Sequence, residues 1–434
     1  MAYTFTLLND GGNSPLFSHQ FNSDYIYSWR EATDYTGYEL IKRHTGTGAI
    51  ALSSPIYSYT DTPIYGDAFA NYSNPAYTDW ANGMLGVAPG GDYIFLSTYA
   101  SNEGAAGITV WDTATLNVVE HLIVATGLSD SRRGGISAMS GDGVYYARSG
   151  DRRFSGSNYA SSYIAMFKYN GGTSPVYNYF DLNDIGITDW VDGIVFDSSG
   201  YLWAVCTVRA FTSGATITGN SKLHKLSVDS STCALTLVDS WTISDYSLRT
   251  GANWDTYYHY FGMTYNSAAD KIYLWSQGND EDANGDSQGW FQMWDVALET
   301  MSGITDFTVG SLESVDENNW SSKIGWSQNT KYVCWLGNGN PSKFELFDVN
   351  TLSATGYLDT LWDDTDLGGL TFWEIRPGNT IFYNQTSNAI LAMGGNNVIN
   401  PSSPFNATDL LFELGDAYAP AGTGRRFVAA IKPI

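Results

Sequence analysis

The chain has 434 residues and a formal net charge of −24, with 45 acidic and 21 basic residues. This balance disfavours a free nucleic-acid partner and an anionic membrane surface, because both need clustered Lys and Arg. Aromatic residues make up 15% of the chain and charged residues only 15%, and Gly numbers 45. Aromatic residues between Gly-, Asn-, Asp- and Ser-rich turns are typical of strands, so the composition predicts an all-β protein.

A unit of two strands, a loop, a third strand and a turn recurs along the chain. A degenerate first copy comprises YIYSWR from Tyr25 and YELIKRH from Tyr38. The clearest copy begins at Leu85 with LGVAPGGDYIFLST and continues with GITVWDTATLNVVEHL, so that a Pro-Gly-Gly-Asp turn separates its first two strands. Further copies begin at Gly135, Asp192, Phe261, Lys323 and Leu370.

These repeats predict a β-propeller of about seven four-stranded blades. We expect one domain over residues 1–434, with clear repeats over about residues 85–395 and closing segments at 1–80 and 400–434. The strand-like segments at Tyr3 and Arg426 predict that one end of the chain completes a blade begun at the other end. Blades stacked on both sides predict second strands that are almost continuously apolar. The alternative is two β-sandwiches in tandem.

Three copies resemble known propeller repeats. The copies at Leu85 and Lys323 resemble YVTN and quinoprotein-like repeats, in Pro89–Phe95, Val110–Thr115 and Phe347–Thr351. The copy at Asp192 resembles the strand pair of gluconolactonase-like propellers. That second resemblance implies a catalytic metal held by a Glu and an Asn or Asp, but the first copy has no Glu at the matching place, which argues against the enzyme.

An acidic stretch has the D-x-D-x-N-G-D form of a calcium loop. Its candidate ligands are Asp280, Asp282, Asn284 and Asp286. Alternating side-chain oxygens and a Gly at the sharp turn can wrap a Ca²⁺ ion. Phe291 occupies the place of the bidentate Glu of an EF-hand, so the sequence predicts either a calcium loop of another kind, between two strands of one blade, or a solvated acidic turn.

Aromatic residues are dense in two predicted loops. The candidate binding residues are Tyr57, Tyr59, Tyr65, Trp80, Trp254, Tyr257, Tyr258 and His259. Tyr and Trp stack on sugar rings or anchor protein interfaces, although packing between blades uses the same residues. His259 precedes a predicted inner strand and either faces a central channel or is packed. His224 alternates with Leu223 and Leu226 and is predicted to be structural.

The sequence has no P-loop and no dinucleotide-binding fingerprint, and it predicts no catalytic residues. Three cysteines are too few for a disulfide framework. Cys206 and Cys233 lie in one predicted blade, where they either pair or are buried thiols.

The composition, rich in Gly, Asn, Ser, Thr and Tyr, resembles that of phage virion proteins. It predicts a non-enzymatic structural or adhesion protein: a tail, fibre or capsid-attached propeller that binds virion proteins or a host-surface glycan, as a homo-oligomer in a larger assembly. Met1–Phe5 show no signal peptide, so we expect synthesis in the host cytoplasm and a final location in the virion. The alternatives are a metal-dependent lactonase or hydrolase-type propeller enzyme and a free carbohydrate-binding lectin.

Overall fold

Antiparallel strands and the turns between them make up almost all of the described chain. The structure is a computed structural model that describes residues 3–8, 16–21, 24–31, 37–44, 49–58, 84–87, 91–100, 105–125, 137–153, 159–169, 171, 175–188, 190–207, 221–243, 260–267, 269–281, 287–302, 305–308, 323–326, 332–336, 344–348, 354–357, 382–384, 389–396 and 425–433. Among these residues, the helical segment is the single 3-10 turn η3 (Leu182–Ile185). A search of the same residues finds no helix that is long and apolar enough to cross a membrane.

The chain divides into two compact units. One comprises residues 127–316, and the other comprises residues 1–126 together with 317–434. Each unit is built from sheets in which strands that follow one another in the chain pair as neighbours. This up-and-down order is that of a propeller blade.

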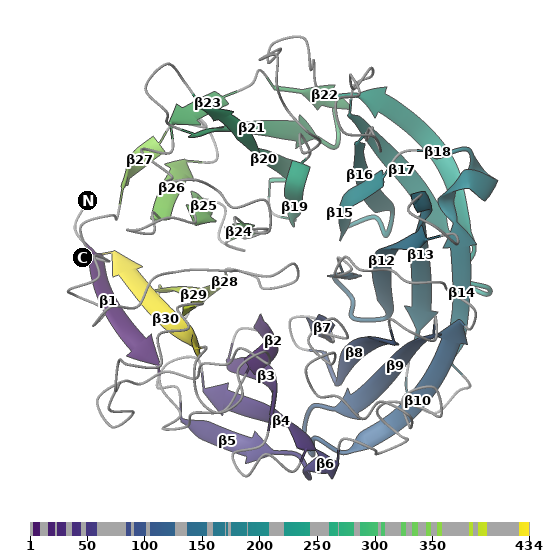
Figure 1. Cartoon of the computed structure of the whole chain (residues 1–434), viewed down its shortest axis with the longest axis vertical. Helices are drawn as coiled ribbons and strands as arrows, with labels where there is room; N and C mark the ends of the chain where they lie inside the picture. The colour runs from purple at the N-terminus through teal and green to yellow at the C-terminus, as the bar shows by residue number, and fades with distance from the viewer. Residues whose placement is uncertain are drawn as a thin grey trace. The chain divides into compact units, whose positions relative to one another are not determined.

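Three sheets account for the strands described in residues 127–316 (Figure 1). The first consists of β11 (Ser137–Met139), β12 (Tyr145–Arg153), β13 (Tyr159–Lys168) and β14 (Val176–Asp181). The second consists of β15 (Trp190–Phe196), β16 (Leu202–Thr207), β17 (Lys222–Val228) and β18 (Leu235–Thr242). The third consists of β19 (Tyr260–Asn266), β20 (Lys271–Glu281), β21 (Ser287–Asp295) and β22 (Thr300–Met301), and β23 (Thr305–Thr308) also pairs with β21.

The first strands of these three sheets lie next to one another, because β15 contacts both β11 and β19. Gly193 in β15 permits the close approach to β19. A Cβ at this position would lie 2.7 Å from Met263 Cγ of β19 and 3.0 Å from Val205 Cγ1 of β16. A glycine is therefore required where the two first strands meet.

The other unit contains two sheets near its N-terminal end. One consists of β2 (Leu16–Phe21), β3 (Tyr25–Glu31), β4 (Gly37–His44) and β5 (Ile50–Ser53), and β6 (Tyr57–Ser58) also pairs with β4. The next consists of β7 (Met84–Val87), β8 (Tyr93–Ala100), β9 (Ala105–Asp112) and β10 (Val118–Ala125). Their first strands, β2 and β7, contact each other.

The same unit holds an eight-stranded sheet that consists of two four-stranded halves. One half comprises β24 (Lys323–Trp326), β25 (Tyr332–Leu336), β26 (Phe344–Asp348) and β27 (Ala354–Tyr357). The other comprises β28 (Phe382–Asn384), β29 (Ala389–Asn396), β30 (Arg425–Pro433) and β1 (Tyr3–Leu8). The halves join through one parallel pair, Trp326 with Phe382.

These pairings confirm the all-β propeller class and the predicted repeats. The degenerate first copy is formed by β3 and β4, and it belongs to a complete sheet. Strand β1 pairs antiparallel with β30 from Tyr3–Pro433 to Leu8–Val428, so the two ends of the chain complete one blade as predicted. Two β-sandwiches would not give this chain-order pairing, because sandwich connections pass between sheets. That the whole chain forms a single domain stays a prediction.

The second strands of the sheets are buried on both faces. Ile94–Leu96 in β8, Leu202–Cys206 in β16 and Ile272–Leu274 in β20 have no exposed surface. This confirms the expected apolar second strands. Five second strands each contribute one fully buried large aromatic side chain: Tyr27, Phe95, Tyr146, Trp203 and Tyr273.

In three sheets, an aspartate at or just after the end of the third strand holds the turn that follows. Asp112 Oδ1 accepts hydrogen bonds from the N–H of Thr115 at 2.8 Å and from its hydroxyl at 2.9 Å. Asp229 Oδ1 accepts four, from the N–H and hydroxyl groups of Ser231 and Thr232, at 2.6–2.9 Å. In the third sheet, Asp295 Oδ1 accepts from the N–H of Leu298 at 2.9 Å. These are Asx turns, in which the carboxylate replaces backbone partners.

The same turns share a left-handed residue four positions after the aspartate. Leu116, Cys233 and Glu299 have φ of 53°, 57° and 52°. Leu116 and Cys233 are fully buried, so in these two turns the strained backbone places an apolar anchor in the core.

The carboxylates of these turns are more acidic than ordinary aspartates. Hydrogen bonds from Ser231 and Thr232 lower the pKa of Asp229 to about 2. The hydroxyl of Thr115 is the largest cause of the lowered pKa of Asp112, and the N–H of Leu298 is the largest cause for Asp295. Each turn therefore stabilises the ionised form of its aspartate.

Acid should weaken these turns. Because the pKa of Asp229 is lower in the folded than in the unfolded protein, its contribution is complete above about pH 4 and is lost as the pH falls towards about 2. We expect Asp229→Asn to melt below the wild type at neutral pH, and the difference to shrink at about pH 2. Thermal melting of both proteins across this range measures the effect, and a difference that does not change with pH would contradict it.

Candidate functional site

Because neighbouring strands are antiparallel, the connections of each blade lie at two opposite ends of its strands. At one end, called here the turn edge, the first strand connects to the second and the third to the fourth, as in the turns after Asp197 and Asp229. At the opposite edge, called here the loop edge, β19 begins at Tyr260, β20 ends at Glu281 and β21 begins at Ser287. Connections from the second strand to the third, and from one blade to the next, therefore join the sheet at the loop edge.

Seven of the eight residues predicted to bind ligands lie outside the described residues: Tyr59, Tyr65, Trp80, Trp254, Tyr257, Tyr258 and His259. Their segments follow β6 or precede β19. The binding role of this set stays a prediction.

Tyr57 is the predicted binding residue whose side chain is described. It lies in β6, and its hydroxyl oxygen accepts a hydrogen bond from Nε1 of Trp111 at 3.3 Å. The two rings meet edge to face with centroids 6.4 Å apart. Trp111 is fully buried in the neighbouring sheet. Tyr57 therefore packs one blade against the next, which is the alternative role considered for these aromatics.

A break in the outer strand brings Tyr57 to this place. Between β5 and β6, Ser54 Oγ accepts from Leu40 N–H at 2.9 Å, and Ser54 N–H donates to Leu40 O at 2.8 Å. Ser302 makes the same pair of bonds with Met293, at 2.9 and 2.8 Å, between β22 and β23. The serine hydroxyl replaces a ladder bond, and this lets the outer strand change direction.

The acidic motif begins at the end of strand β20 and continues into the segment before β21. Asp280 lies in β20, and residues 282–286 connect β20 to β21 at the loop edge. The ladder is irregular here, because Gln277 pairs with Gly289 and Glu281 with Ser287. Asp282, Asn284 and Asp286 lie outside the described residues, so calcium binding stays a prediction. Within the described residues, no three His, Cys, Asp or Glu side chains are placed to share a metal ion.

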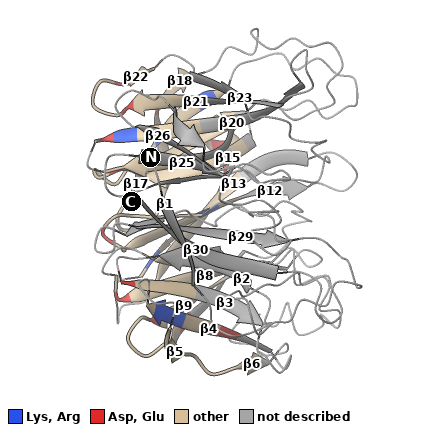
Figure 2. Cartoon of the chain, turned by 90° about the vertical axis from the view of Figure 1, so that its left-hand side faces the viewer, with Lys and Arg blue, Asp and Glu red and all other residues tan. Residues whose placement is uncertain are grey.

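At the turn edge, lysines of the third strand reach from one sheet to the next. Lys42 of β4 donates from Nζ to the carbonyl oxygen of Thr113 at 2.9 Å, in the turn after β9. Its ammonium lies 4.0 Å from the ring centroid of Tyr25 in its own sheet. Burial lowers the pKa of Lys42, and the carboxylate of Asp112 opposes that shift. Figure 2 shows basic and acidic residues side by side near the β4 and β9 labels.

Lys168 of β13 makes the same connection in residues 127–316. Its Nζ donates to the carbonyl oxygen of Ser230 at 2.7 Å, in the turn after β17. The ammonium lies 5.7 Å from the ring centroid of Tyr145. A second bond runs beside it, from Asn178 Nδ2 to the carbonyl oxygen of Thr232 at 3.2 Å.

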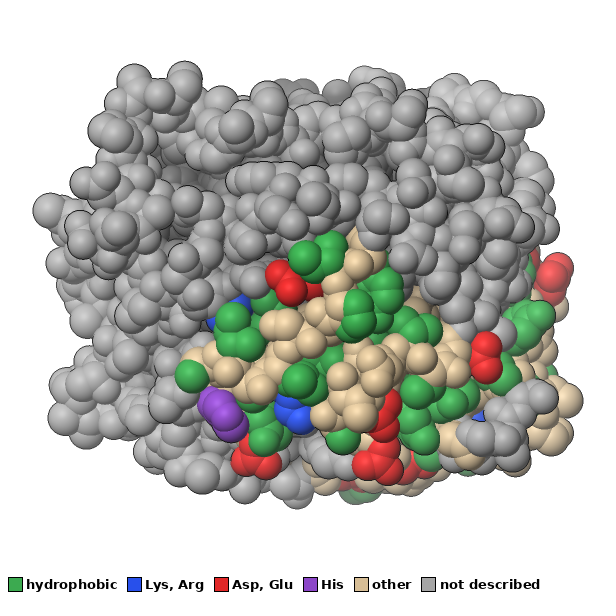
Figure 3. All heavy atoms as spheres, turned by 90° about the horizontal axis from the view of Figure 1, so that it is seen from below, with side chains coloured by type: hydrophobic (Ala, Val, Ile, Leu, Met, Phe, Trp, Pro, Cys, Tyr) green, Lys and Arg blue, Asp and Glu red, His purple; other side chains and the backbone are tan. Residues whose placement is uncertain are grey.

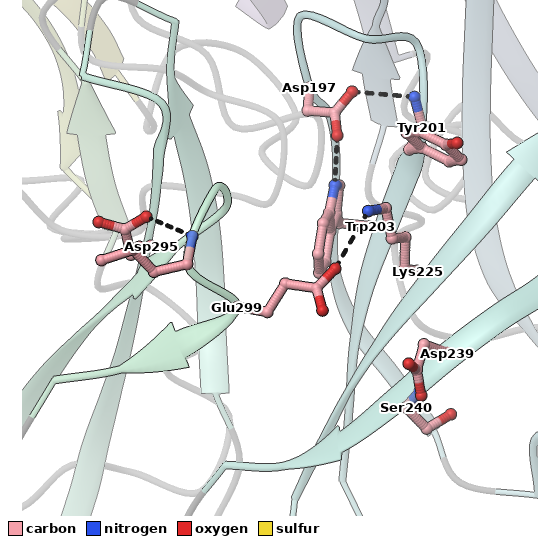
Figure 4. Close-up of polar contacts among 9 residues, drawn as sticks. Asp197, Tyr201, Trp203, Lys225, Asp239, Ser240, Asp295 and Glu299 are labelled. Atoms are coloured by element: carbon pink, nitrogen blue, oxygen red, sulfur yellow. Dashed lines mark hydrogen bonds and ion pairs between the residues drawn. The ribbon is translucent and has the colours of Figure 1, made fainter.

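Lys225 of β17 forms an ion pair in place of the carbonyl bond. Its Nζ lies 3.5 Å from Glu299 Oε1 in the turn after β21, and 4.5 Å from the ring centroid of Tyr201. Figure 4 shows Lys225 and Glu299 pointing towards each other beside Trp203. The side chain of Glu299 is 46% exposed, so solvent screens this pair.

Asp197 holds the turn between β15 and β16. Its Oδ1 accepts from the N–H of Ser199 at 2.8 Å and of Tyr201 at 2.9 Å, and its Oδ2 accepts from Trp203 Nε1 at 2.8 Å. Asp197 is 4% exposed and Trp203 is fully buried. The carboxylate therefore satisfies three donors, one of them in the core.

A tryptophan cluster joins the sheets of β15–β18 and β19–β23. Trp203 and Trp241 stack with ring centroids 5.5 Å apart. Trp294 of β21 tilts against both, at 6.1 and 4.9 Å. The three rings extend the apolar core between the two sheets.

The remaining candidate groups are structural. His224 is buried, with Nδ1 2.7 Å from Ser240 Oγ on the neighbouring strand, as expected for a structural histidine. Cys206 and Cys233 are buried thiols in one core cluster, which was one of the two interpretations of their spacing. Burial raises the pKa of Cys233 to about 11, so this thiol stays protonated near neutral pH and is a poor nucleophile.

Sequence reasoning missed most of the turn-edge contacts. Two features of the sequence could have indicated these contacts: a Lys in the third strand, and an Asp at or just after the end of that strand. Lys225 and Asp229 are an example. The contacts that result are hydrogen bonds and ion pairs within and between blades. They fix geometry, and none supplies a base next to a nucleophile at an open cleft.

Replacing Asp197 should destabilise the protein. In Asp197→Asn, the new amide NH₂ group faces one of the N–H groups that donate to the carboxylate in the wild type. That N–H group then has no acceptor and is left unsatisfied. We expect a loss of about 1–3 kcal/mol in the free energy of unfolding, measured by chemical denaturation.

Asp142→Asn is the matched control. Asp142 is exposed, and its Oδ1 accepts from Val144 N–H at 3.0 Å and from the Ser140 hydroxyl, which an amide oxygen can also do. This variant should stay within about 0.5 kcal/mol of the wild type. Equal losses in the two variants would overturn the role given to Asp197.

No protein-family model matches the sequence, and no curated protein matches it. Solved structures are similar to it. A putative 6-phosphogluconolactonase from Bacteroides uniformis is 15% identical, with a TM-score of 0.43, over 84% of this chain and 89% of that one. The periplasmic gluconolactonase of Pseudomonas aeruginosa is 10% identical, with a TM-score of 0.46, over 80% and 84%. Kuenenia stuttgartiensis hydrazine synthase is 12% identical, with a TM-score of 0.47, over 89% and 94%.

Two of these structures are a putative 6-phosphogluconolactonase and a gluconolactonase. The resemblance to virion proteins stays a prediction. The blade assignment itself rests on the strand pairing described above.

Proposed function

We propose that this protein is a non-enzymatic binding propeller that recognises its ligand at the loop edges of its blades. One observation carries the proposal: at the turn edge, the charged side chains whose contacts are described above hold turns or adjacent blades together. Lys42, Lys168 and Asp197 are examples. We therefore assign recognition of the ligand to the loop edge, where the aromatic segments of the sequence join the sheets.

The ligand class follows from those segments and from the net charge. Tyr and Trp supply flat, amphipathic surfaces for a sugar ring or for a protein partner. The charge of −24 disfavours nucleic acid. We therefore propose a host-surface glycan or a structural protein as the partner. Assembly in a phage virion, as a tail, fibre or capsid-attached component, is the finer part of the proposal and rests on composition alone.

The second candidate is a metal-dependent lactonase or hydrolase-type propeller enzyme. Two of the solved structures similar to this chain are a putative 6-phosphogluconolactonase and a gluconolactonase. An enzyme of this class would need a metal site, and its ligands would have to come from the loop edge. The two candidates make opposite predictions for lactone turnover.

The test combines turnover and binding. Purified protein supplied with calcium or zinc should hydrolyse gluconolactone and its 6-phosphate no faster than buffer does, as followed by pH-stat. On a glycan array it should bind a defined set of glycans. Trp254→Ala should weaken that binding by about tenfold or more, which corresponds to the loss of one stacking contact of about 1.4 kcal/mol.

Tyr177→Ala, at an exposed position of an outer strand, is the control for the array. Turnover that EDTA abolishes would replace the binding proposal with the enzyme. An empty array with no turnover would remove glycan recognition and leave a protein partner, which co-purification from virions would identify.

Calcium binding is a separate proposal for the acidic loop. Asp280, Asp282, Asn284 and Asp286 are oxygen donors of the kind that Ca²⁺ prefers. Titration calorimetry of the wild type with Ca²⁺ should give a binding isotherm, and Asp282→Ala should remove it. Asp184→Ala, at an exposed acidic position in η3, should leave the isotherm unchanged. A wild type that gives no heat of binding would end the proposal.

A further inference from the structure

Strand β1 is an outer strand that no turn connects to its own sheet. In the other blades the outer strand follows the third strand directly in the sequence, as β10 follows β9 and β27 follows β26. Strand β1 instead precedes β2, which belongs to another sheet. Figure 1 shows β1, in purple, beside β30, in yellow. The place of β1 in its sheet is therefore determined by strand pairing and not by a short connection.

The sheet extends as far as β30 without β1. Strand β30 pairs with β29 over seven residues, from Ile390–Ile431 to Asn396–Arg425, and β29 pairs with β28. Strand β1 adds six pairs on the other side of β30, from Tyr3–Pro433 to Leu8–Val428, without a register shift. A blade that lost its β1 would keep three strands and would present the edge of β30 to a replacement strand.

The sequence of β1 suits it to this place. It reads YTFTLL, with no charged residue, no Pro and no Gly, and its alternation of large apolar residues with Thr is typical of a strand. Phe5 is in register with Ile431, and Leu7 with Ala429. A shift by one residue would bring a Thr opposite Ile431, so the alternation specifies one register.

The link between β1 and β2 is short and contains two glycines. Residues 9–15 separate the two strands and include Gly11 and Gly12, and Gly adopts more backbone conformations than other residues do. A fully extended segment of this length can span about 25 Å. The sequence of the link therefore allows β1 to reach β30 of its own chain or β30 of a second copy.

The exposed hydrophobic side chains do not offer a second copy a different surface. Among the described residues of this unit, the large ones are Ile50, Ile56 and Val119. On the face in Figure 3, hydrophobic side chains are interspersed with acidic, basic and polar ones. The backbone of β30, rather than an apolar patch, is thus the feature through which two copies can join.

Exchange of β1 between copies conserves its pairing. In a second copy, β1 would form the same six pairs with β30 that it forms in its own chain. The balance between the two arrangements then depends on the entropy lost on association and on any strain in the link. A second copy also supplies the one strand that is known to fit this edge in register, whereas a strand from another protein would have to match it.

We propose that two copies of this chain exchange β1, so that the β1 of each copy completes the last blade of the other and joins the two as a dimer. The proposal needs no free edge in the monomer, because the incoming β1 replaces the resident one. It does not depend on glycan, virion or calcium binding, so its failure would leave those proposals unchanged.

Cysteines at one register pair distinguish the two arrangements. Thr6 is in register with Ala430. With Thr6→Cys in one tagged chain and Ala430→Cys in a second, differently tagged chain, a disulfide at this pair forms only when β1 of the first chain lies beside β30 of the second. Co-expression of the two chains and mild oxidation should give a linked pair on a non-reducing gel, which a reductant separates.

Thr6→Cys co-expressed with Val238→Cys is the matched control. Val238 is 50% exposed and lies in β18, away from the pair under test. This combination should stay unlinked, since it can form a disulfide only by chance collision of exposed thiols. Light scattering of the wild type should show a dimer whose fraction rises with protein concentration.

Three results would overturn the proposal: no linked pair for Thr6→Cys with Ala430→Cys, equal linking in the control, or a wild type that is monomeric at every concentration. A chain that carries both cysteines adds a further check. If the dimer of this double variant forms its disulfide only within each chain, the copies meet through another surface and β1 is not exchanged.

Discussion

The most consequential interaction in this protein is the lysine that connects one blade to the next. Its ammonium lies against an aromatic ring of its own sheet and reaches a turn of the following sheet, as Lys42 and Lys168 do. Sheets that are buried on both faces leave little room for charge in their interior, because a buried charge must be paired. Three of the described lysines, Lys42, Lys168 and Lys225, therefore lie where two blades meet. The aspartates that hold the turns present the carbonyl groups that these lysines bind.

The sequence was sufficient to predict the blades, their order and the blade shared by both ends. Strand alternation and turn chemistry are local properties, and YIYSWR from Tyr25 carried enough of both to be recognised in a degenerate copy. The contacts between blades could not be predicted in the same way. Lys225 meets Glu299 only because the packing of two sheets brings them together, and Ser54 replaces a ladder bond only once Leu40 is its neighbour.

The sequence was sufficient to predict the residue types of the candidate site but not their geometry. Tyr57 illustrates the difficulty: the same ring that could stack on a sugar hydrogen-bonds Trp111 of the next blade. Composition cannot separate these roles, because both need a flat ring with a polar end. The structure adds that the turn edge and the loop edge of the blades differ in their contacts. At the turn edge, the described Lys and Asp side chains hold turns and neighbouring blades together. The connections from second to third strands and from blade to blade, which differ in length, join the sheets at the loop edge.

The pairing of β1 with β30 has a consequence for folding. These strands stand at opposite ends of the numbered sequence, from Tyr3–Pro433 to Leu8–Val428. During synthesis the earlier blades can form one after another, but β1 has no partner until β30 has emerged. Its backbone groups stay available to other strands during that time, so the last blade is the step most exposed to aggregation. A chain shortened at its C-terminal end would keep most of its blades and still carry this unpaired strand.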